Sequence, residues 1–347
     1  MRVLLADPPA FTPQYDHELA AALARAGAEV DLVTSRFRFG EAPAPVGYCR
    51  RELFYPLSSR VFGRSRLRLP VKAVEHPLGL VRLALLQADV AHLQWLAAPE
   101  LDARLLRTRA PLVFTAHDLL PRRTAAKRDL WLRLFGRFER IVVHSERGRA
   151  ALAELGVDET KLRVIPHPVT PSDPPRTDDG RTVLALGVIR PYKQVDHAAA
   201  AVARVDGARL LVAGDPAGPL PANLEGADLR LGYLPHAALQ RALGDATVAV
   251  FPYRAELDQS GALLQALGAG IPAVVYDVGG LPDPVRTYGA GRVVPADDVD
   301  ALAAAIRELL DDPAALAEAR AGARRAREAL TWDASAATHL ELYGELR

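Results

Sequence analysis

Two cations follow a predicted strand at positions where they could bind a diphosphate group. The strand covers residues 182–187 and ends at Gly187, and Arg190 and Lys193 stand in the polar loop before the next helix. An arginine can bind two oxygens with paired donors, and a lysine adds a compact point charge. Spacing alone leaves the alternative open that both are solvated loop cations.

A predicted helix start further along the chain offers backbone groups to the same kind of ligand. The stretch 251–280 begins with an apolar strand, passes a polar turn and continues as a short helix expected over residues 261–267. Ser260 and Gly261 mark the start of this helix, where amides without intrahelical partners bind phosphates or sugar hydroxyls. Its glycines also suit helix ends and turns.

A histidine is the third candidate. His117, followed by Asp118, comes directly after a predicted strand, where it could hydrogen-bond a hydroxyl group. The alternative is an ordinary loop histidine paired with Asp118. His92 is expected to be structural. His144 and His167 also follow strands, but the spacing of these histidines fits no zinc pattern, so no metal site is predicted.

The elements that must position these residues alternate between strand and helix. Buried strands such as RVLLAD and TVLALG are separated by helical stretches, which predicts an α/β fold with largely parallel sheets. A proline-rich run interrupts the pattern and reads as a linker. We therefore expect a first domain at 1–170, a linker at 171–181, a second domain at 182–330 and a last helix at 331–347 that crosses back to the first domain.

Composition narrows the class of protein. The 347 residues carry a net charge of +1, which argues against a nucleic-acid partner. Cys49 is the only cysteine, so no internal disulfide can form, as is typical of a reducing compartment. No apolar run reaches the roughly 18 residues of a membrane span. The expected location is the cytoplasm, with peripheral contact to a membrane as an addition.

One segment departs from this charge balance. Between Arg36 and Arg82 there are ten basic and three acidic residues, mixed with Phe37, Phe39, Phe54, Tyr55 and Phe62. Such a surface could meet an anionic lipid headgroup or a lipid-linked diphosphate acceptor. The alternative is a solvated basic loop.

The ordered set of motifs resembles a known family. LGVIRPYK, LLVAGDP, LGYLP, the stretch 251–280 and the terminal TWDASAATHLELY are similar in type and order to those of retaining glycosyltransferases of family 4, which have the GT-B fold. The resemblance covers nearly the whole chain and is strongest from Thr182 onward. It implies two Rossmann-like domains that face each other across a cleft, and sugar transfer from a UDP- or GDP-linked donor without a metal or other cofactor.

The resemblance also assigns roles to individual positions. It implies that Gly187, Arg190 and Lys193 lie at the donor diphosphate and that the two cations stabilise it as it leaves. The resemblance further implies that Tyr233 and Leu234 bind the nucleotide base and that Ser260 and Gly261 bind the donor sugar and phosphates. It implies that Gln265 binds the ribose and that His117 lies near the transferred sugar.

Two departures from the family pattern affect these roles. The family has two glutamates separated by seven residues; here Gln265 replaces the second, and Glu256 is one residue out of register with the first. A glutamine can still bind ribose hydroxyls. Glu256 is the candidate for the carboxylate that contacts the donor sugar, and Asp258 or a backbone group are the alternatives. The first strand leads into DPPAFTPQ in place of a glycine-rich loop, so the acceptor stays unidentified and a lipid-linked acceptor is one alternative.

Other functions remain open at this point. A nucleotide-sugar epimerase or a phosphorylase would share the fold, but neither acid–base carboxylates nor a pyridoxal lysine stand out. The altered glutamates leave open a catalytically silent sugar-nucleotide binding module. A nicotinamide dehydrogenase is disfavoured, because no G-x-G-x-x-G follows any strand.

Overall fold

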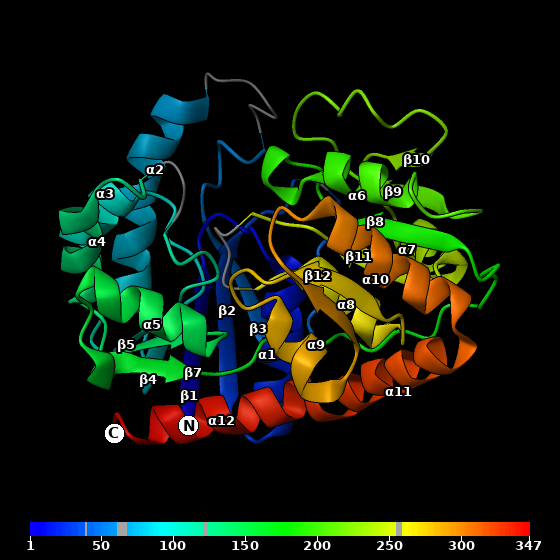
Figure 1. The fold of residues 1–347 in the computed structure, drawn as a ribbon. Coiled ribbons are helices and arrows are strands. Elements are labelled where there is room, and N and C mark those ends of the chain that lie inside the picture. Colours follow the sequence, from blue (N-terminus) through cyan, green and yellow to red (C-terminus); the bar gives the residue numbers. More distant parts are fainter. Residues whose placement is uncertain (39, 61–67, 121–123, 255–258) are drawn as a thin grey trace. The chain divides into compact units, whose positions relative to one another are not determined.

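The computed structural model describes residues 1–38, 40–60, 68–120, 124–254 and 259–347. Its contacts divide the chain into two compact units. Unit 1 combines Met1–Pro166 with Trp332–Arg347, and unit 2 is His167–Thr331. Each unit is an α/β structure built on one parallel sheet (Figure 1).

Unit 1 has a seven-stranded sheet in the order β3-β2-β1-β4-β5-β6-β7, and every pairing is parallel. The strands are β1 (Arg2–Asp7), β2 (Glu29–Ser35), β3 (Cys49–Phe54), β4 (Val90–Leu93), β5 (Leu112–Thr115), β6 (Arg140–Val143) and β7 (Leu162–Val164). The helices are α1 (Pro13–Arg25), α2 (Arg68–Ala84), α3 (Pro99–Leu105), α4 (Arg128–Phe135), α5 (Glu146–Leu155) and α12 (Trp332–Gly344), with a 3-10 turn η1 (Glu159–Lys161).

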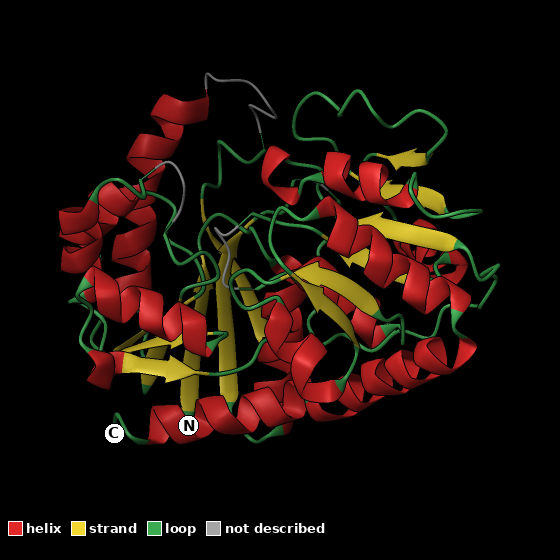
Figure 2. Ribbon diagram, viewed as in Figure 1, coloured by secondary structure: helices red, strands yellow, loops and turns green. Residues whose placement is uncertain are grey.

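Helices cover both faces of this sheet (Figure 2). Successive strand residues point to opposite faces, so each face builds its own core. Val3 and Leu5 pack with residues of α1 and α12, whereas Leu4 packs with residues of α2, α4 and α5. Burial on both faces explains why these strands read as continuous apolar runs.

Unit 2 has a six-stranded parallel sheet in the order β10-β9-β8-β11-β12-β13. The strands are β8 (Thr182–Leu186), β9 (Arg209–Gly214), β10 (Asp228–Leu231), β11 (Val248–Phe251), β12 (Ala273–Tyr276) and β13 (Gly291–Val294). The helices are α6 (Val195–Val202), α7 (His236–Asp245), α8 (Gly261–Gly268), α9 (Pro282–Tyr288), α10 (Val299–Asp311) and α11 (Pro313–Ala329), with a 3-10 turn η2 (Pro191–Lys193). One apolar core surrounds this sheet.

The proline-rich segment 167–181 lies against unit 2. Ser172 and Thr177 donate backbone hydrogen bonds to the carbonyls of Gly268 and Gly244. A Cβ on Gly268 would come within 2.2 Å of the carbonyl oxygen of Thr170. The close approach of the segment to α8 therefore depends on this glycine.

Strand β3 was not expected from the sequence. Its residues Arg50, Arg51 and Glu52 are not buried, which removes the apolar pattern by which strands are recognised. The strand lies at the sheet edge beside β2, and Arg51 binds Asp31 of β2 at 2.9 Å. Charged side chains are usual on edge strands because they oppose pairing with another chain.

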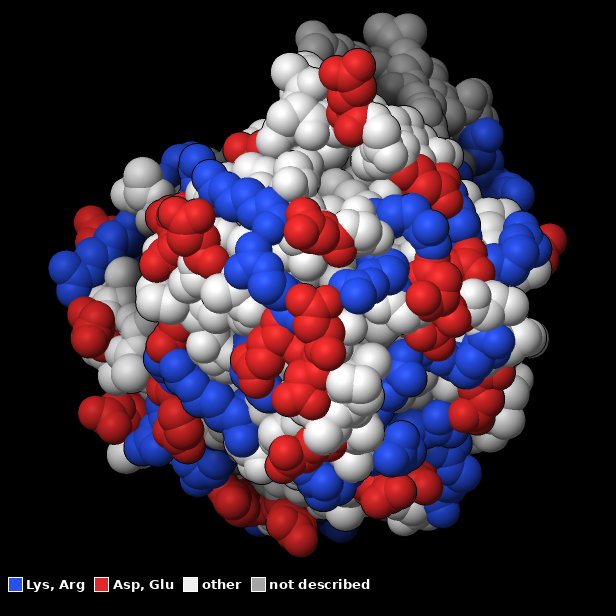
Figure 3. All heavy atoms as spheres, turned by 45° about the vertical axis from the view of Figure 1, so that its right-hand side comes forward, with Lys and Arg blue, Asp and Glu red and all other residues white. Residues whose placement is uncertain are grey.

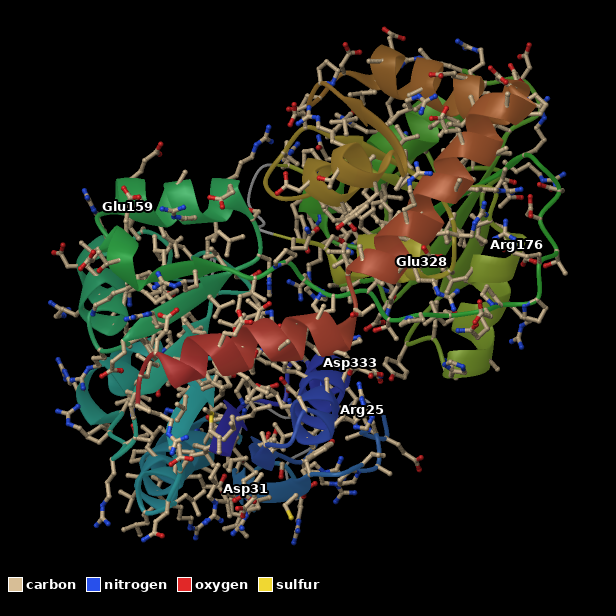
Figure 4. The ribbon with its side chains drawn as sticks, turned by 90° about the horizontal axis from the view of Figure 1, so that it is seen from below. Arg25, Asp31, Glu159, Arg176, Glu328 and Asp333 are labelled. Carbon is tan, nitrogen blue, oxygen red and sulfur yellow. The ribbon has the colours of Figure 1, made fainter. Side chains whose placement is uncertain are left out.

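Helix α12 completes the core of unit 1. It lies beside α1, where Arg25 forms an ion pair with Asp333 at 2.5 Å (Figure 4). At its buried face, Tyr343 is hydrogen-bonded to Nδ1 of His92 at 2.6 Å. His92 comes from the middle of β4 and its Nε2 contacts Thr115 Oγ1, so the expectation that it is structural is confirmed. His339 of α12 lies beside it, with ring centroids 5.5 Å apart.

In the ranges given above, no helix has the length and apolarity to cross a bilayer. On the face shown in Figure 3, basic and acidic residues are interspersed and neither sign forms a continuous area.

The buried histidines should make unit 1 acid-sensitive. Burial lowers the pKa of His339 from 6.5 to about 4 and holds that of His92 well below 6.5. The unfolded chain then binds protons that the folded chain does not, so stability is complete above about pH 6.5 and falls as the pH drops toward 4. For His339 alone the loss between about pH 7 and about pH 5 is about 2 kcal/mol.

Urea unfolding of the His339→Gln variant across this pH range measures the effect. We expect a flatter pH dependence than in the unchanged protein, whatever the absolute stability. His236→Gln removes an exposed histidine and serves as the control. A pH slope that His339→Gln leaves unchanged would rule out this residue as the source.

Candidate functional site

The loops after β8 and β9 approach each other so closely that two glycines are required. Gly187 has φ +99°, and a Cβ on Gly214 would lie 2.2 Å from the carbonyl oxygen of Gly187. A Cβ on Gly187 itself would come within 2.8 Å of Lys193 Nζ and 3.2 Å of Ala262 Cβ. The loop after β8, the turn η2 and the start of α8 therefore meet at one point of unit 2.

Lys193 is the buried cation at this point. It is only 8% exposed. Among the described residues, its ammonium has one long hydrogen bond, 3.5 Å to the carbonyl of Leu186, and it lies 5.0 Å from the ring centre of Tyr253. An ammonium can donate three hydrogen bonds, so these contacts leave it poorly compensated for the loss of water. Burial accordingly lowers the pKa of Lys193 to about 8.

The start of α8 matches its prediction. The helix runs from Gly261 to Gly268, and Ser260 is its N-cap, accepting a hydrogen bond from Leu263 N. The amide of Ser260 is occupied, because Gln259 Oε1 accepts from it at 2.9 Å. Gly261 is exposed, and a Cβ there would meet no atom of the described residues within 4 Å. As a first-turn residue it has an amide without an intrahelical partner.

The remaining predicted residues of unit 2 differ in exposure. Arg190 is exposed and precedes η2. Tyr233 is 60% exposed after β10, whereas Leu234 packs partly on the core. Gln265 is half-buried on α8, one turn after Gly261. Glu256, proposed as a donor ligand, lies outside the described residues.

In unit 1, His117 lies in a network of rings and hydrogen bonds at the carboxyl ends of the strands. Its ring stacks on Trp95 with centroids 5.2 Å apart and an angle of 16°, and it meets Tyr15 edge-on. Its Nε2 is 3.0 Å from the side-chain amide of Gln94, and its Nδ1 is 3.4 Å from Nε2 of His144. The ring is thus held on several sides.

The direction of these hydrogen bonds can be assigned. His144 Nδ1 is 2.9 Å from the carbonyl of Ile165, so Nδ1 must carry the hydrogen. In neutral rings, His144 Nε2 then accepts from His117 Nδ1, and His117 Nε2 accepts from Gln94. This direction requires the Gln94 amide to be turned so that its nitrogen faces His117, which places its oxygen where the nitrogen has no partner among the described residues.

Sequence reasoning did not identify four residues of these two sites. Tyr253 and Gln259 lie inside the stretch 251–280, where the sequence indicates a strand and a turn and no role for either side chain. Gln94 and Trp95 directly follow β4, and a polar or aromatic residue just past a parallel strand is the signal that could have found them. In the described parts of the chain, no three His, Cys, Asp or Glu side chains gather as a metal site requires.

Comparisons with known proteins indicate the same kind of protein along most of the chain. A sequence profile described as "Glycosyltransferase Family 4" matches residues 14–173, and one described as "Glycosyl transferases group 1" matches residues 180–312. A D-inositol 3-phosphate glycosyltransferase 1 of Catenulispora acidiphila is 31% identical over 337 residues, which cover 90% of this chain and 75% of that protein.

Solved structures share the fold. Sucrose-phosphate synthase of Thermosynechococcus elongatus superposes with a TM-score of 0.76 at 21% identity, covering 100% of this chain and 99% of that one. HepE of Anabaena, solved in complex with UDP-glucose, superposes with a TM-score of 0.69 at 16% identity, covering 100% of both chains.

The lowered pKa of Lys193 predicts how anion binding depends on pH. The amine loses its charge as the pH rises through about 8, whereas Arg190 stays charged. The affinity for an anion at this site should therefore fall by up to about tenfold per pH unit above that value. Calorimetric titration with inorganic pyrophosphate between about pH 7 and about pH 9.5 measures it.

Lys193→Met is the matched variant for this titration. It should bind pyrophosphate more weakly and keep only the pH dependence that comes from the ligand's own titration. Identical slopes for the variant and the unchanged protein would show that Lys193 does not bind the anion.

Proposed function

Because the chain belongs to the group 1, family 4 glycosyltransferases, which have the GT-B fold, we propose that it transfers a sugar from a nucleotide-sugar donor to an acceptor hydroxyl with retention of anomeric configuration. The observation that carries the proposal is the buried, poorly compensated ammonium of Lys193 beside Gly187 and the start of α8. Among the described residues no carboxylate forms an ion pair with this ammonium, and a diphosphate would supply negative charge to it.

The proposed donor site uses three kinds of group. The buried Lys193 and the exposed Arg190 both bind the diphosphate. The amide of Gly261 and the positive end of α8 bind a phosphate or a sugar hydroxyl. Tyr233 and Leu234 would receive the base, and Gln265 the ribose. UDP-glucose bound to HepE supports a UDP-linked donor, and a GDP-linked donor is the alternative.

Charge explains how these groups would accelerate transfer. As the bond from the anomeric carbon to the diphosphate oxygen breaks, its electron pair stays on the diphosphate and positive charge builds on the sugar ring. Fixed cations and a helix N-terminus stabilise that leaving group without a divalent metal. The acceptor oxygen then bonds to the same face of the sugar, and its proton passes to a leaving phosphate oxygen. His117, held in one orientation by Gln94 and His144, would contact the transferred sugar.

We predict that Lys193→Met and Arg190→Ala each reduce turnover by about 100-fold or more, because each removes charge from the leaving group. Turnover is measured as UDP or GDP release from a panel of nucleotide sugars, in EDTA and again with magnesium. We expect the unchanged protein to be equally active in both. Lys127→Met removes an exposed lysine of unit 1 and serves as the control.

Thermal unfolding with UDP, GDP and their sugars separates binding from transfer. A bound nucleotide should raise the melting temperature of the unchanged protein. Near-normal turnover in either variant would exclude that residue from the site, and turnover lost with EDTA would exclude a metal-free mechanism. Binding without turnover for every donor would indicate a silent binding module.

A peripheral membrane contact is the second part of this proposal, and α2 supports it. Leu69, Val74, Leu78, Val81 and Leu85 are all exposed, and the last four lie on one helical face. The only acid of this helix, Glu75, is turned inward and accepts the amides of Leu57 and Ser58. The outer side of α2 is thus apolar, and Arg82 is an exposed basic residue of the same helix. Helices that lie on anionic membranes combine apolar and basic residues in this way.

The aromatic residues of this region need one correction. The sequence predicts Phe54 and Tyr55 on the basic surface between Arg36 and Arg82, but both are buried in the core of unit 1. Phe39 and Phe62, and the side chains of Arg64, Arg66 and Arg68, lie outside what the structure describes. The contact proposed here therefore rests on the exposed apolar residues of α2 and on Leu85, which directly follows this helix.

We predict that the protein co-sediments with anionic vesicles and that the double variant Val81→Ser, Leu85→Ser binds them several-fold less, because it loses apolar contact area. Binding should also weaken with salt, since the basic residues contribute about 1 kcal/mol each near the surface. Leu105→Ser, an exposed leucine of α3, is the control. Equal binding to neutral and anionic vesicles, or no loss in the double variant, would contradict the contact.

A further inference from the structure

Gln194 directly follows Lys193 and has a backbone conformation that glutamine rarely adopts. It has φ 44° and ψ 50°, in the left-handed region, where it ends η2 and caps the start of α6. A side chain at such a φ is strained against its own backbone, and glutamine is not among the residues that tolerate this region best. Strain of this kind persists only where the surroundings hold the residue in place.

A second residue in the left-handed region holds Gln194 through its side chain. Asp297, in the turn between β13 and α10, has φ 60°, and its Oδ1 accepts a hydrogen bond from Gln194 Nε2 at 2.7 Å. Among the described residues other than glycine, four have a positive φ, and two of these four are this pair. One short hydrogen bond to a carboxylate, which is stronger than a bond between neutral groups, therefore joins two strained backbones of unit 2.

The side-chain amide of Gln194 has one usable orientation. The residue is 2% exposed, and its Nε2 also lies 3.3 Å from Nε2 of His197, whose Nδ1 is 3.0 Å from the hydroxyl of Tyr276. In this orientation the buried Oε1 of Gln194 has no hydrogen-bond partner among the described residues. Turning the amide would bring Oε1 against Asp297 Oδ1, and both atoms are acceptors. The bond to Asp297 therefore fixes the amide even though its oxygen stays unpaired.

The backbone of Gln194 determines where the side chain of Lys193 lies. Lys193 is the last residue of η2, and the carbonyl of Gln194 accepts the amides of His197 and Ala198 at the start of α6. Gln194 thus connects the turn to the helix, and a change of its φ would rotate η2 relative to α6. A Cβ on Gly187 would come within 2.8 Å of Lys193 Nζ, so a small rotation is enough to displace the ammonium.

We propose that Gln194 is a positioning residue for the donor site: its hydrogen bond to Asp297 holds the end of η2 in the left-handed conformation and so keeps the ammonium of Lys193 in its buried place. The effect on sugar transfer rests on the proposed function, in which Lys193 binds the diphosphate. Asp297 acts through the amide of Gln194, since the pKa of Lys193 is shifted by burial and by Tyr192 and Arg190.

NMR of protein labelled with [13Cε]lysine reports the surroundings of Lys193 without any ligand. The chain has only four lysines, and Lys193→Met identifies the signal of the buried one. In the unchanged protein this signal should titrate with a pKa of about 8. Gln194→Ala lacks the amide and favours a right-handed backbone. It should raise the pKa of Lys193 by about one unit or more, because a displaced ammonium reaches water.

Three further variants separate the hydrogen bond, the backbone conformation and the charge. Asp297→Gly permits the left-handed turn but removes the acceptor, and it should raise the pKa of Lys193 as Gln194→Ala does. Gln194→Gly adopts the left-handed conformation without help, so it should leave that pKa at about 8, and adding Asp297→Gly should change nothing more. Asp297→Asn keeps an acceptor oxygen without the charge and is the matched control.

Three results would overturn the proposal. They are a Lys193 signal that Gln194→Ala and Asp297→Gly leave unchanged, one that Gln194→Gly shifts as far as Gln194→Ala, and one that Asp297→Asn shifts as far as Asp297→Gly. Turnover of nucleotide sugars separates the two proposals: it should fall by about tenfold or more in Gln194→Ala and Asp297→Gly and stay within about twofold in Gln194→Gly. A protein that shows the NMR pattern and transfers no sugar would retain the positioning role and lose the proposed function.

Discussion

The buried ammonium of Lys193, at the carboxyl end of the parallel sheet, is the main chemical feature of unit 2. Lys193 can lie there only because Gly187 and Gly214 allow two backbone loops to touch, and because the ring of Tyr253 gives the charge a partial partner. A larger residue at Gly187 would push the ammonium aside. The site thus depends on two glycines, which have no side chain, as much as on the side chain of Lys193. The diphosphate of the proposed donor would offset the cost of burying this charge.

The elements that position this site were readable from the sequence because both faces of each sheet are buried. Continuous apolar runs gave β1, β8 and β11, and a serine before a glycine gave the start of α8 at its true position. Edge strand β3 did not follow this rule, because its charged residues bind Asp31 and solvent instead of a core.

Burial was the part of the site that spacing could not reveal. Arg190 and Lys193 look equivalent in a polar loop, yet one is exposed and the other is nearly inaccessible. The difference arises because the turn η2 places the side chain of Lys193 against Gly187 and the ring of Tyr253. In the same way His92 and His117 each follow or lie in a strand, and only the fold shows that one anchors a helix and the other stacks on Trp95.

The position of α12 has a consequence for how the protein is made. The face of the unit 1 sheet that carries Val3 and Leu5 is covered by α1 and by α12, and α12 is synthesised after all of unit 2. Domains commonly fold as they emerge, in order from the N-terminus. Here unit 1 emerges first but cannot finish its core until all of unit 2 has been translated. One face of the unit 1 sheet therefore stays partly uncovered, and accessible to chaperones, while unit 2 is translated. Unit 2 can thus complete its core before unit 1 does.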